Sequence, residues 1–509
     1  VSEVKPTQLL GMAEVMADEA VHFHSITIGS MHIGLITRGW SYTSRVYEDL
    51  EDLYLHVTTS LASASAGRQL DSEALAEQVS EKRRAKAWRG KLDWKARLKP
   101  QSWDDEDLAP SHIGGLRDVA LSLDKLPDVR KQGLIVGSAL EKFFREDPAA
   151  LRTILDAVRD KIEDAATIEP TVVKIAQCIG KVVGCSELDR GHVLGLNCEV
   201  RAHLIRDWRR FAGDPDDDVP SWFFDGAPLG IKATPLSKNI FPEYSDKDPA
   251  ADISTLASEI MDGRRSQASK DPDAVEEVAK MVSKKWIMRL KSKMQAKRFV
   301  KGKLILSDLI VITKVKRSRL KGKLVSKTKK RLILNLKKSG VTAVAVKAER
   351  PELPRVLDVI FANLELLKKW KKRWHRKSLR HVVLDFANAF FHFPTREDER
   401  RFFATRLGKD VLVWLRTAQG SRGAPLVCGR ALALIMRLAA STIPPDEMTA
   451  STYVDDPIST FIGDKARQDV NIGKLIGCIL ACGFELAFSK AQDSHTEPVI
   501  TWTSARLEL

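Results

Sequence analysis

Two strand-like runs meet at a pair of adjacent acids, Asp455 and Asp456, and this pattern constrains the fold more than any other feature of the chain. Residues 448–454 and 457–462 are rich in β-branched, aromatic and small residues, which is typical of strands. Because only a short break separates the two runs, they predict an antiparallel hairpin with both carboxylates at its tip.

A third acid, Asp385, lies at the end of another strand-like run, residues 381–386. This apolar and β-branched run is typical of a buried strand that delivers one carboxylate at its C-terminal end. Three like charges brought together are strongly disfavoured unless cations neutralise them. Oxygen ligands without converging Cys or His favour Mg²⁺ or Mn²⁺ over zinc, and two such ions can promote an in-line phosphoryl displacement. The alternative is that each acid is a solvated turn residue, which is the usual case for a lone Asp-Asp pair.

The basic charge of the chain is concentrated in one segment. Residues 281–380 contain 32 Lys and Arg against 5 Asp and Glu, whereas the formal net charge of all 509 residues is only +15. Such a block fits a polyanionic partner, because each neutralised phosphate releases condensed counterions. The alternative is a solvated linker. Next to three acids, the basic segment favours nucleotidyl transfer on a nucleic acid.

Length and composition describe a globular protein of about three domains, with 44% hydrophobic and 29% charged residues. No uncharged apolar run of about 18 residues is present, so we expect no membrane-spanning helix and no membrane partner. No secretory leader is recognisable at the start, and Val1 as the first residue suggests a piece of a longer product. Six cysteines at irregular spacing suit a reducing compartment, and we expect an intracellular location, cytoplasmic or nuclear.

Upstream of the basic segment, the sequence carries structural signals but no chemistry. Residues 1–210 are predicted to be a helical domain of unknown role, as in 151–162, where apolar residues recur every three or four positions. Residues 72–95 predict another long helix. Residues 211–280 are rich in Pro, Gly and Asp and predict a boundary region with a linker helix. The four acids within 214–218 are expected to form a solvated turn, because they lack the pattern of a calcium loop.

Three segments match, in order and spacing, the signature of a known family. Residues 453–456 (YVDD) meet its Tyr-x-Asp-Asp box, residues 384–391 (LDFANAFF) meet its first-aspartate segment, and residues 419–425 (QGSRGAP) meet its Gln-Gly-x-x-Gly-Ser/Ala-Pro turn. On these segments the C-terminal part of the chain resembles a reverse transcriptase of the retrotransposon and retroviral kind. The resemblance implies an α+β fold with the right-hand polymerase arrangement. Basic fingers would span 281–380, and a palm with part of the fingers inserted would span 381–509 and end at the primer-grip region. The palm would be a split βαβ antiparallel sheet backed by helices.

The resemblance also implies an activity and a set of site residues. The chain would be an RNA-directed DNA polymerase from a retroelement polyprotein, a nucleotidyltransferase that adds dNTPs to a primer on an RNA or DNA template. Two Mg²⁺ or Mn²⁺ ions would be held by Asp385, Asp455 and Asp456. The nucleotide would meet Arg331 at its triphosphate, Phe390 against C2′ of its sugar, Gln419, and Lys490 as a proton donor to pyrophosphate. Template and primer would contact Tyr453, Arg422, Gly423, Pro425 and Trp502.

Two residues depart from the family pattern. Asn388 stands where many relatives carry a second acid, and Pro457 removes a ladder N–H directly after the acid pair. A catalytically inactive, nucleic-acid-binding descendant is therefore one alternative. The other is an RNA-dependent RNA polymerase, which shares the palm, although the aromatic Phe390 leaves no room for a sugar hydroxyl and predicts deoxynucleotide substrates.

Overall fold

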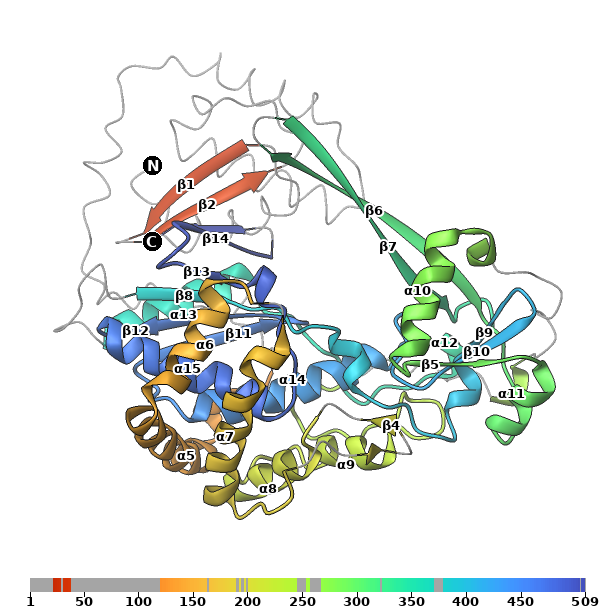
Figure 1. Ribbon diagram of the computed structural model, residues 1–509, viewed down its shortest axis with the longest axis horizontal. Coiled ribbons are helices and arrows are strands. Elements are labelled where there is room, and N and C mark those ends of the chain that lie inside the picture. The colour runs from red at the N-terminus through yellow and green to blue at the C-terminus, as the bar shows by residue number, and fades with distance from the viewer. Residues whose placement is uncertain are drawn as a thin grey trace.

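The computed structural model describes residues 22–28, 31–37, 120–162, 164–188, 192–193, 196–197, 200–244, 253–256, 267–320, 323–369, 379–503 and 505–508. The helix that the sequence predicts over 72–95 lies outside these residues. Helices and sheets both contribute to the described part, in several layers (Figure 1).

The α-helices of the described part are α5 (Pro127–Glu146), α6 (Pro148–Arg159), α7 (Ala165–Val183), α8 (Ala202–Ala212), α9 (Asp218–Asp225), α10 (Pro272–Ser283), α11 (Lys293–Phe299), α12 (Val341–Val344), α13 (Val356–Lys369), α14 (Ala424–Ser441) and α15 (Lys465–Ala481). Short 3₁₀ helices are η4 (Leu123–Lys125), η5 (Ile253–Thr255), η6 (Gln267–Lys270), η8 (Ala389–His392), η9 (Arg400–Phe402) and η10 (Phe488–Lys490). The helix predicted from the apolar repeat over 151–162 is confirmed as α6, whose buried face includes Ile154 and Val158.

The strands form five sheets within the described residues. The central sheet has the order β11-β12-β8-β13, with β8 (Leu379–Val383), β11 (Met448–Tyr453), β12 (Asp456–Ile462) and β13 (Gln492–Asp493). A second sheet has the order β1-β2-β15-β14, with β1 (His22–Ile28), β2 (Met31–Thr37), β14 (Val499–Trp502) and β15 (Ala505–Glu508). A third sheet orders β5 (Ile287–Leu290), β10 (Asp410–Trp414) and β9 (Ala404–Leu407), and two ribbons pair β6 (Asp308–Leu320) with β7 (Lys323–Asn335) and β3 (His192–Val193) with β4 (Leu196–Asn197).

The central sheet is buried on both faces, and alternate residues of β8 serve the two sides. Val382 belongs to the large hydrophobic cluster that α14 and α15 share, whereas Val383 belongs to a second cluster with α13 and the β14–β15 hairpin. This is the period-two alternation of a strand placed between two layers. The buried strand and the acid-tipped hairpin predicted from the sequence are therefore confirmed as β8 and as β11–β12.

Helices α5 to α8 pack on α14 and α15 within the same large hydrophobic cluster. Two glycines of α5 allow its close approach to the end of α14. A Cβ atom at Gly133 would lie 2.0 Å from the Oγ of Ser441, and one at Gly137 would lie 2.0 Å from the carbonyl oxygen of Thr442. The domain boundaries expected at 210, 280 and 380 stay predictions. The helices before 210 and the elements after 381 share one hydrophobic core.

The expectation of a solvated turn at residues 214–218 is wrong for two of its four acids. The side chains of Asp214 and Asp216 are fully buried, while Asp217 and Asp218 remain partly exposed. Arg437 donates to Asp214 at 2.7 and 2.9 Å, and Arg430 donates to Asp216 at 3.0 Å. Both arginines lie inside the otherwise apolar helix α14, so each requires a buried acid as its partner. The acids thus fix the chain before α9 onto α14.

Helix α14 is long and apolar enough to cross a membrane by length and composition, but 83% of that stretch is buried inside the protein. Among the described helices it is the only one of this kind. Such burial is typical of the core helix of a globular protein.

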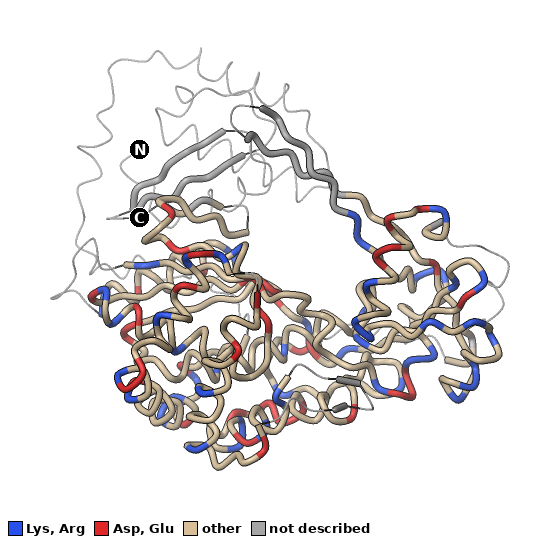
Figure 2. The backbone as a smooth tube through the Cα atoms, in the orientation of Figure 1, with Lys and Arg blue, Asp and Glu red and all other residues tan. Residues whose placement is uncertain are grey.

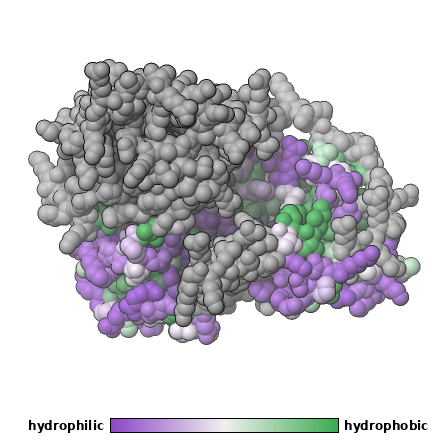
Figure 3. Space-filling view, turned by 90° about the horizontal axis from the view of Figure 1, so that it is seen from above, coloured by the Kyte–Doolittle hydropathy of each residue, from purple (hydrophilic) through white to green (hydrophobic). Residues whose placement is uncertain are grey.

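The long β6–β7 ribbon leaves the third sheet and runs diagonally toward β1 and β2 (Figure 1). Leu309 and Leu334, which face each other in its register, are buried at its base. Lysine and arginine are frequent in the half of the molecule that holds the base of this ribbon, while an acidic segment lies near the centre (Figure 2). The space-filling view adds a hydrophobic patch on the same half, within an otherwise largely hydrophilic coloured surface (Figure 3).

Candidate active site

Main-chain hydrogen bonds bring Asp385 to the tip of the β11–β12 hairpin. The residue lies in the loop after β8, and its neighbours on both sides bond to the hairpin. Leu384 donates its N–H to the carbonyl of Pro457 at 2.9 Å, and Phe386 donates to the carbonyl of Asp455 at 2.8 Å. The side chains of Asp385 and Asp456 are in hydrogen-bond contact, so three acids from distant parts of the sequence form one anionic site.

The turn that carries Asp455 has an unusual backbone. Tyr453 pairs with Asp456, so Val454 and Asp455 form a two-residue connection. Val454 has a φ of 56°, in the left-handed region that β-branched residues rarely adopt. Such strain persists where the surroundings impose it, and it is often found at functional sites.

Pro457 is tolerated because of where the ladder begins. In a hairpin the closing pair exchanges both hydrogen bonds, and the next pair, here Thr452 with Pro457, exchanges none. On the other side, the pairing of β12 with β8 starts only at Ile458, and Pro457 contributes its carbonyl to Leu384. The missing N–H therefore leaves no gap in either ladder.

Burial and mutual repulsion perturb the hairpin acids. Burial first, and then the charges of Asp455 and Asp385, raise the pKa of Asp456 to about 7 against the opposing charge of Lys490. Burial is also the main cause of the raised pKa of Asp455, with Asp385 adding to it and with Lys490 and Arg331 opposing it. The site is thus short of positive charge, as expected of carboxylates that would accept a cation.

Lys490 is the cation nearest to Asp385. Its Nζ lies 2.6 Å from both carboxylate oxygens. The chain is placed there by a bridge between Phe386 and Leu486 and by the N–H of Ala487, which donates to the carbonyl of Asp385 at 2.8 Å. No three or more Asp, Glu, His or Cys side chains in the described residues are arranged as a ready metal cage. The oxygen donors nevertheless suit a hard divalent cation, because only added positive charge relieves their repulsion.

Apart from Lys490, the residues predicted to bind a nucleotide are Arg331, Phe390 and Gln419, which lie on three separate segments. Arg331 is exposed on β7, and its charge acts on Asp455. Phe390 is half-buried in η8, where its carbonyl accepts a hydrogen bond from the hydroxyl of Thr417. The carbonyl of Gln419 accepts from the N–H of Leu334 at 3.1 Å, which ties the 419–425 turn to β7.

Glycine is required at two positions of that turn. Gly420 has a φ of 103°, and a Cβ there would lie 2.5 Å from the carbonyl oxygen of Leu334. At Gly423, which is buried, a Cβ would lie 2.3 Å from the carbonyl oxygen of Leu229. Pro425 is exposed in the first turn of α14, where its missing N–H leaves no helical hydrogen bond unmade.

The two aromatic residues predicted to contact nucleic acid differ in exposure. Tyr453 is 37% exposed and packs edge-on against Trp502, with ring centroids 6.2 Å apart. Trp502 is only 2% exposed, and its Nε1 donates to the carbonyl of Asp456 at 2.9 Å. Trp502 therefore supports the hairpin tip from the second hydrophobic cluster, and the ring that could meet a ligand is that of Tyr453.

Beside Arg422, which the sequence predicts as a nucleic-acid contact, the structure places Lys347, Arg350 and Tyr244, which the sequence analysis did not identify. Arg422 donates to the hydroxyl of Tyr244 at 3.3 Å. Burial lowers the pKa of Lys347, and the nearby charges of Arg422 and Arg350 lower it further. Lys347 and Arg350 lie in the basic segment, which gave a general signal, but nothing in the local sequence singles out Tyr244.

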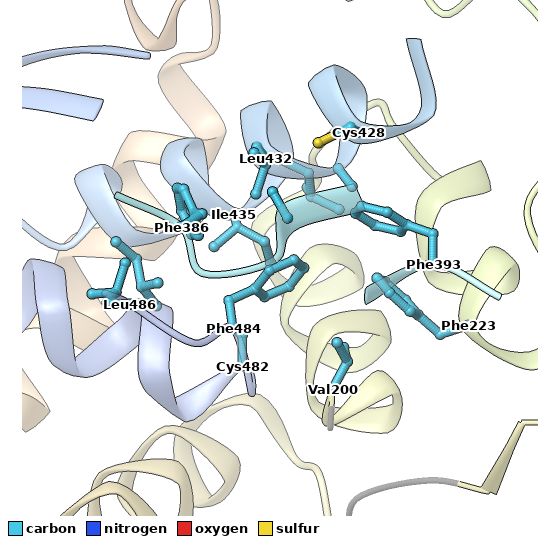
Figure 4. Close-up of a cluster of buried hydrophobic side chains, with 14 of the residues drawn as sticks. Val200, Phe223, Phe386, Phe393, Cys428, Leu432, Ile435, Cys482, Phe484 and Leu486 are labelled. Atoms are coloured by element: carbon cyan, nitrogen blue, oxygen red, sulfur yellow. The ribbon is translucent and has the colours of Figure 1, made fainter. Parts of the chain in front are cut away.

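Aromatic packing fixes the loop that carries Asp385 and Phe390. Phe386, Phe393 and Phe484 lie together over Phe223 of α9 and beside α14 (Figure 4). Next to Phe390, the ring of Phe391 stacks on Trp286 at 4.1 Å. Rings packed from several elements hold such a loop in one conformation.

Comparisons with known proteins add a partial likeness. No family model and no curated protein matches the chain. Among solved structures, a foamy viral protease-reverse transcriptase in complex with double-stranded DNA matches with a TM-score of 0.33 and 14% identity, over 50% of this chain and 37% of that one. The same kind of protein in complex with an RNA/DNA hybrid matches with a TM-score of 0.31 and 14% identity, over 47% of this chain and 26% of that one. A third, with dsDNA, has a TM-score of 0.32 and 15% identity over 51% and 43%. The chain thus spans less than half the length of these structures, and likeness at this level carries no inference about function.

Proposed function

We propose that the chain is a nucleotidyltransferase that extends a primer along a nucleic-acid template, and more specifically an RNA-directed DNA polymerase of a retroelement. The observation that carries the proposal is the pair of main-chain bonds that fasten Asp385 to a strained hairpin tip bearing Asp455 and Asp456. Lys490 and Arg331 act on the same acids. Three carboxylates next to cations suited to a triphosphate are the groups that this reaction needs.

In the proposed reaction, the 3′-oxygen of the primer forms a bond to the α-phosphorus of a dNTP, and the bond from that phosphorus to the bridging oxygen of pyrophosphate breaks. Asp385, Asp455 and Asp456 would hold two Mg²⁺ or Mn²⁺ ions, which supply charge neutralisation at the attacking and leaving oxygens. The hydroxyl proton passes to water, and Lys490 would give a proton to the departing pyrophosphate. Lys490 would first have to leave Asp385, whose charge it balances in the metal-free structure.

The other parts of the site have roles that follow from their positions. Arg331 would bind the triphosphate with its planar fork, and Gln419 would contact the nucleotide from the turn fastened to β7. Phe390 would exclude a 2′-hydroxyl, with its backbone held by Thr417. The basic 281–380 segment and the arrangement of fingers around a palm would bind template and primer, with Arg422 and Tyr453 at the turn and hairpin. The proposed place of action is the cytoplasm or the nucleus.

Primer extension on poly(rA)/oligo(dT) with Mg²⁺ tests the enzyme. We expect wild type to extend the primer and Asp455→Asn to lose extension while still binding the duplex. If wild type extends the primer no faster than this variant, the chain is a non-catalytic, nucleic-acid-binding descendant. In that case the contact between Lys490 and Asp385 would serve to stabilise the fold. Phe390→Ala should relax the preference for dNTP over NTP, and a wild type indifferent to the sugar would instead indicate an RNA-dependent RNA polymerase.

A further inference from the structure

The proposed reaction leaves a basic cavity between α8 and α9 without a role. Its volume is about 400 Å³, and its lining includes His203, Arg206, Arg209 and Arg210 from α8, with Ser221 and Phe224 from α9. We propose that this cavity binds a phosphate group of a single-stranded nucleic acid, at a site separate from the active site. The identity of the ligand as a strand rests on the proposed function, whereas the affinity for phosphate does not.

The cavity is separated from the acids by α14. This helix contacts α8 and α9 on one side and β11 on the other. In Figure 1, α8 and α9 lie along the lower edge of the molecule, and the central sheet lies above α14 and α15. A phosphate in the cavity would therefore belong to a part of the strand away from the reacting end.

The periodicity of α8 explains why three arginines share one face. Leu204, Ile205 and Trp208 are buried against the core, so this amphipathic helix directs the residues of its opposite face toward the surface. Arg206, Arg209 and Arg210 follow at spacings of three and four residues and so lie on one side of the helix. Planar guanidinium groups bind phosphate oxygens in pairs, which makes this side suited to that anion.

The acids near the cavity are already engaged by cations. Asp207 accepts from Arg206 at 2.9 Å and lies 3.6 Å from Arg210. Asp217, which lines the cavity, is paired with Lys238 at 2.7 Å. Because Arg206 and Arg210 share the single charge of Asp207, and Asp217 is paired with Lys238, the three arginines keep an excess of positive charge.

Two buried nitrogen atoms in the lining lack a partner. Within the described part of the chain, neither Nε of Arg209 nor Nδ1 of His203 has a hydrogen-bond partner. A buried donor without a partner is costly, and an anion in the cavity would supply an acceptor to Arg209. Arg209 is thus the lining residue that a bound oxyanion would satisfy, whereas the ring of His203 already places its Nε2 3.1 Å from a carboxylate oxygen of Glu187.

The apolar side of the cavity fits a nucleotide better than a bare ion. Phe224 meets the ring of His203 edge-on at 4.8 Å, and the guanidinium of Arg206 lies 5.9 Å from the centre of the Phe224 ring. An aromatic ring beside arginines is the arrangement with which proteins hold single strands, by stacking on the base and pairing with the phosphate. A strand therefore uses both halves of the cavity, whereas inorganic phosphate uses only one.

The test compares the full chain with two charge-matched double variants. Arg209→Gln with Arg210→Gln alters the cavity, and Arg145→Gln with Arg152→Gln removes the same charge from exposed positions of α5 and α6. Calorimetric titration with inorganic phosphate and anisotropy of a labelled 12-nucleotide RNA, both without divalent ions, give the two affinities. Melting curves verify that both variants are folded.

We expect the cavity variant to bind phosphate at least tenfold more weakly and the control to stay within twofold of wild type. For RNA, the slope of log affinity against log salt should fall by about 0.7 for each phosphate that the variant no longer neutralises. If both double variants weaken phosphate binding equally, the proposed phosphate site in the cavity is overturned. A weakening confined to inorganic phosphate, with unchanged RNA binding, would overturn the strand as the ligand. Because neither measurement involves primer extension, a failed polymerase assay with an intact difference between the variants would reject the proposed function alone.

Discussion

Removing the charge of Asp216 should destabilise the protein strongly, because its partner Arg430 is buried in the core. Both side chains are 0% exposed. Arg430 also donates to the carbonyl of Leu236 at 2.7 Å, and its guanidinium lies 5.1 Å from the centre of the Trp222 ring. Asp216→Asn keeps the shape of the side chain, so the change isolates the buried one of the two charges that pair with the guanidinium; the other, Asp218, lies 3.2 Å away and is 25% exposed.

The expected destabilisation follows from the geometry. Charge centres about 4 Å apart interact by about 4 kcal/mol at an effective dielectric constant of about 20. Breaking a buried pair by removing one partner costs about 3–5 kcal/mol, since the other charge stays buried. The neighbouring Asp217 pairs with Lys238 at 2.7 Å but is 53% exposed, so Asp217→Asn should cost about 0–1 kcal/mol.

Urea unfolding followed by tryptophan fluorescence measures the difference. At an m value of about 3 kcal/mol/M, the midpoint of Asp216→Asn should fall by about 1 M or more, and that of Asp217→Asn should hardly move. Combining Asp216→Leu with Arg430→Met removes both charges and should recover much of the stability, as apolar replacements of buried pairs do. The reasoning is refuted if Asp216→Asn and Asp217→Asn cost the same, or if the double variant is less stable than Asp216→Asn.

Three further outcomes follow from single positions. Burial lowers the pKa of His381 and of His392 to about 4, so the unfolded chain binds protons below about pH 6.5 that the folded chain refuses. The free energy of unfolding should therefore fall by about 1.4 kcal/mol per pH unit for each histidine as the pH drops from about 6.5 to 4. Denaturant titrations at several pH values across this range give the free energy of unfolding. Its slope against pH should be shallower in His381→Asn than in wild type. Gly137→Ala should cost about 1–3 kcal/mol by overpacking α5 against Thr442, while Ser138→Ala on the exposed side of α5 should cost little in the same unfolding assay. Gly420→Ala adds strain of about 1–3 kcal/mol where the turn meets β7, so KM for the nucleotide should rise about tenfold or more, and an unchanged KM would remove the turn from the nucleotide site.

The parts of the site that could be predicted from the sequence are those set by short-range patterns. Runs of strand-forming residues with acids at their ends predict both β8 and the hairpin. An acid that directly follows such a run must lie at the end of the strand. The turn at 419–425 was identified by its match to a short family signature, whose two glycines and proline are read directly from the sequence. Each of these features depends on a few neighbouring residues.

The features that were missed depend on partners far apart in the chain. Asp216 and Arg430 are separated by more than 200 residues, and an acid in a Pro- and Asp-rich stretch looks solvated until its partner is known. The burial of Trp502 is similar, since it follows from α13 and the β14–β15 hairpin closing over β8. Local sequence carries no record of such contacts.

A buried carboxylate connects these long-range contacts to the candidate site. Glu399 is 0% exposed and accepts hydrogen bonds from the N–H groups of Leu229, Ile231, Lys232 and Ala233 at 2.6 to 3.1 Å. These bonds set the position of the 229–233 loop, against which Gly423 packs so tightly that no side chain would fit. The 419–425 turn is thus held by Glu399 on one side and by β7 on the other. Because a turn held from two sides has little freedom to move, this rigidity is what a nucleotide-binding turn would require.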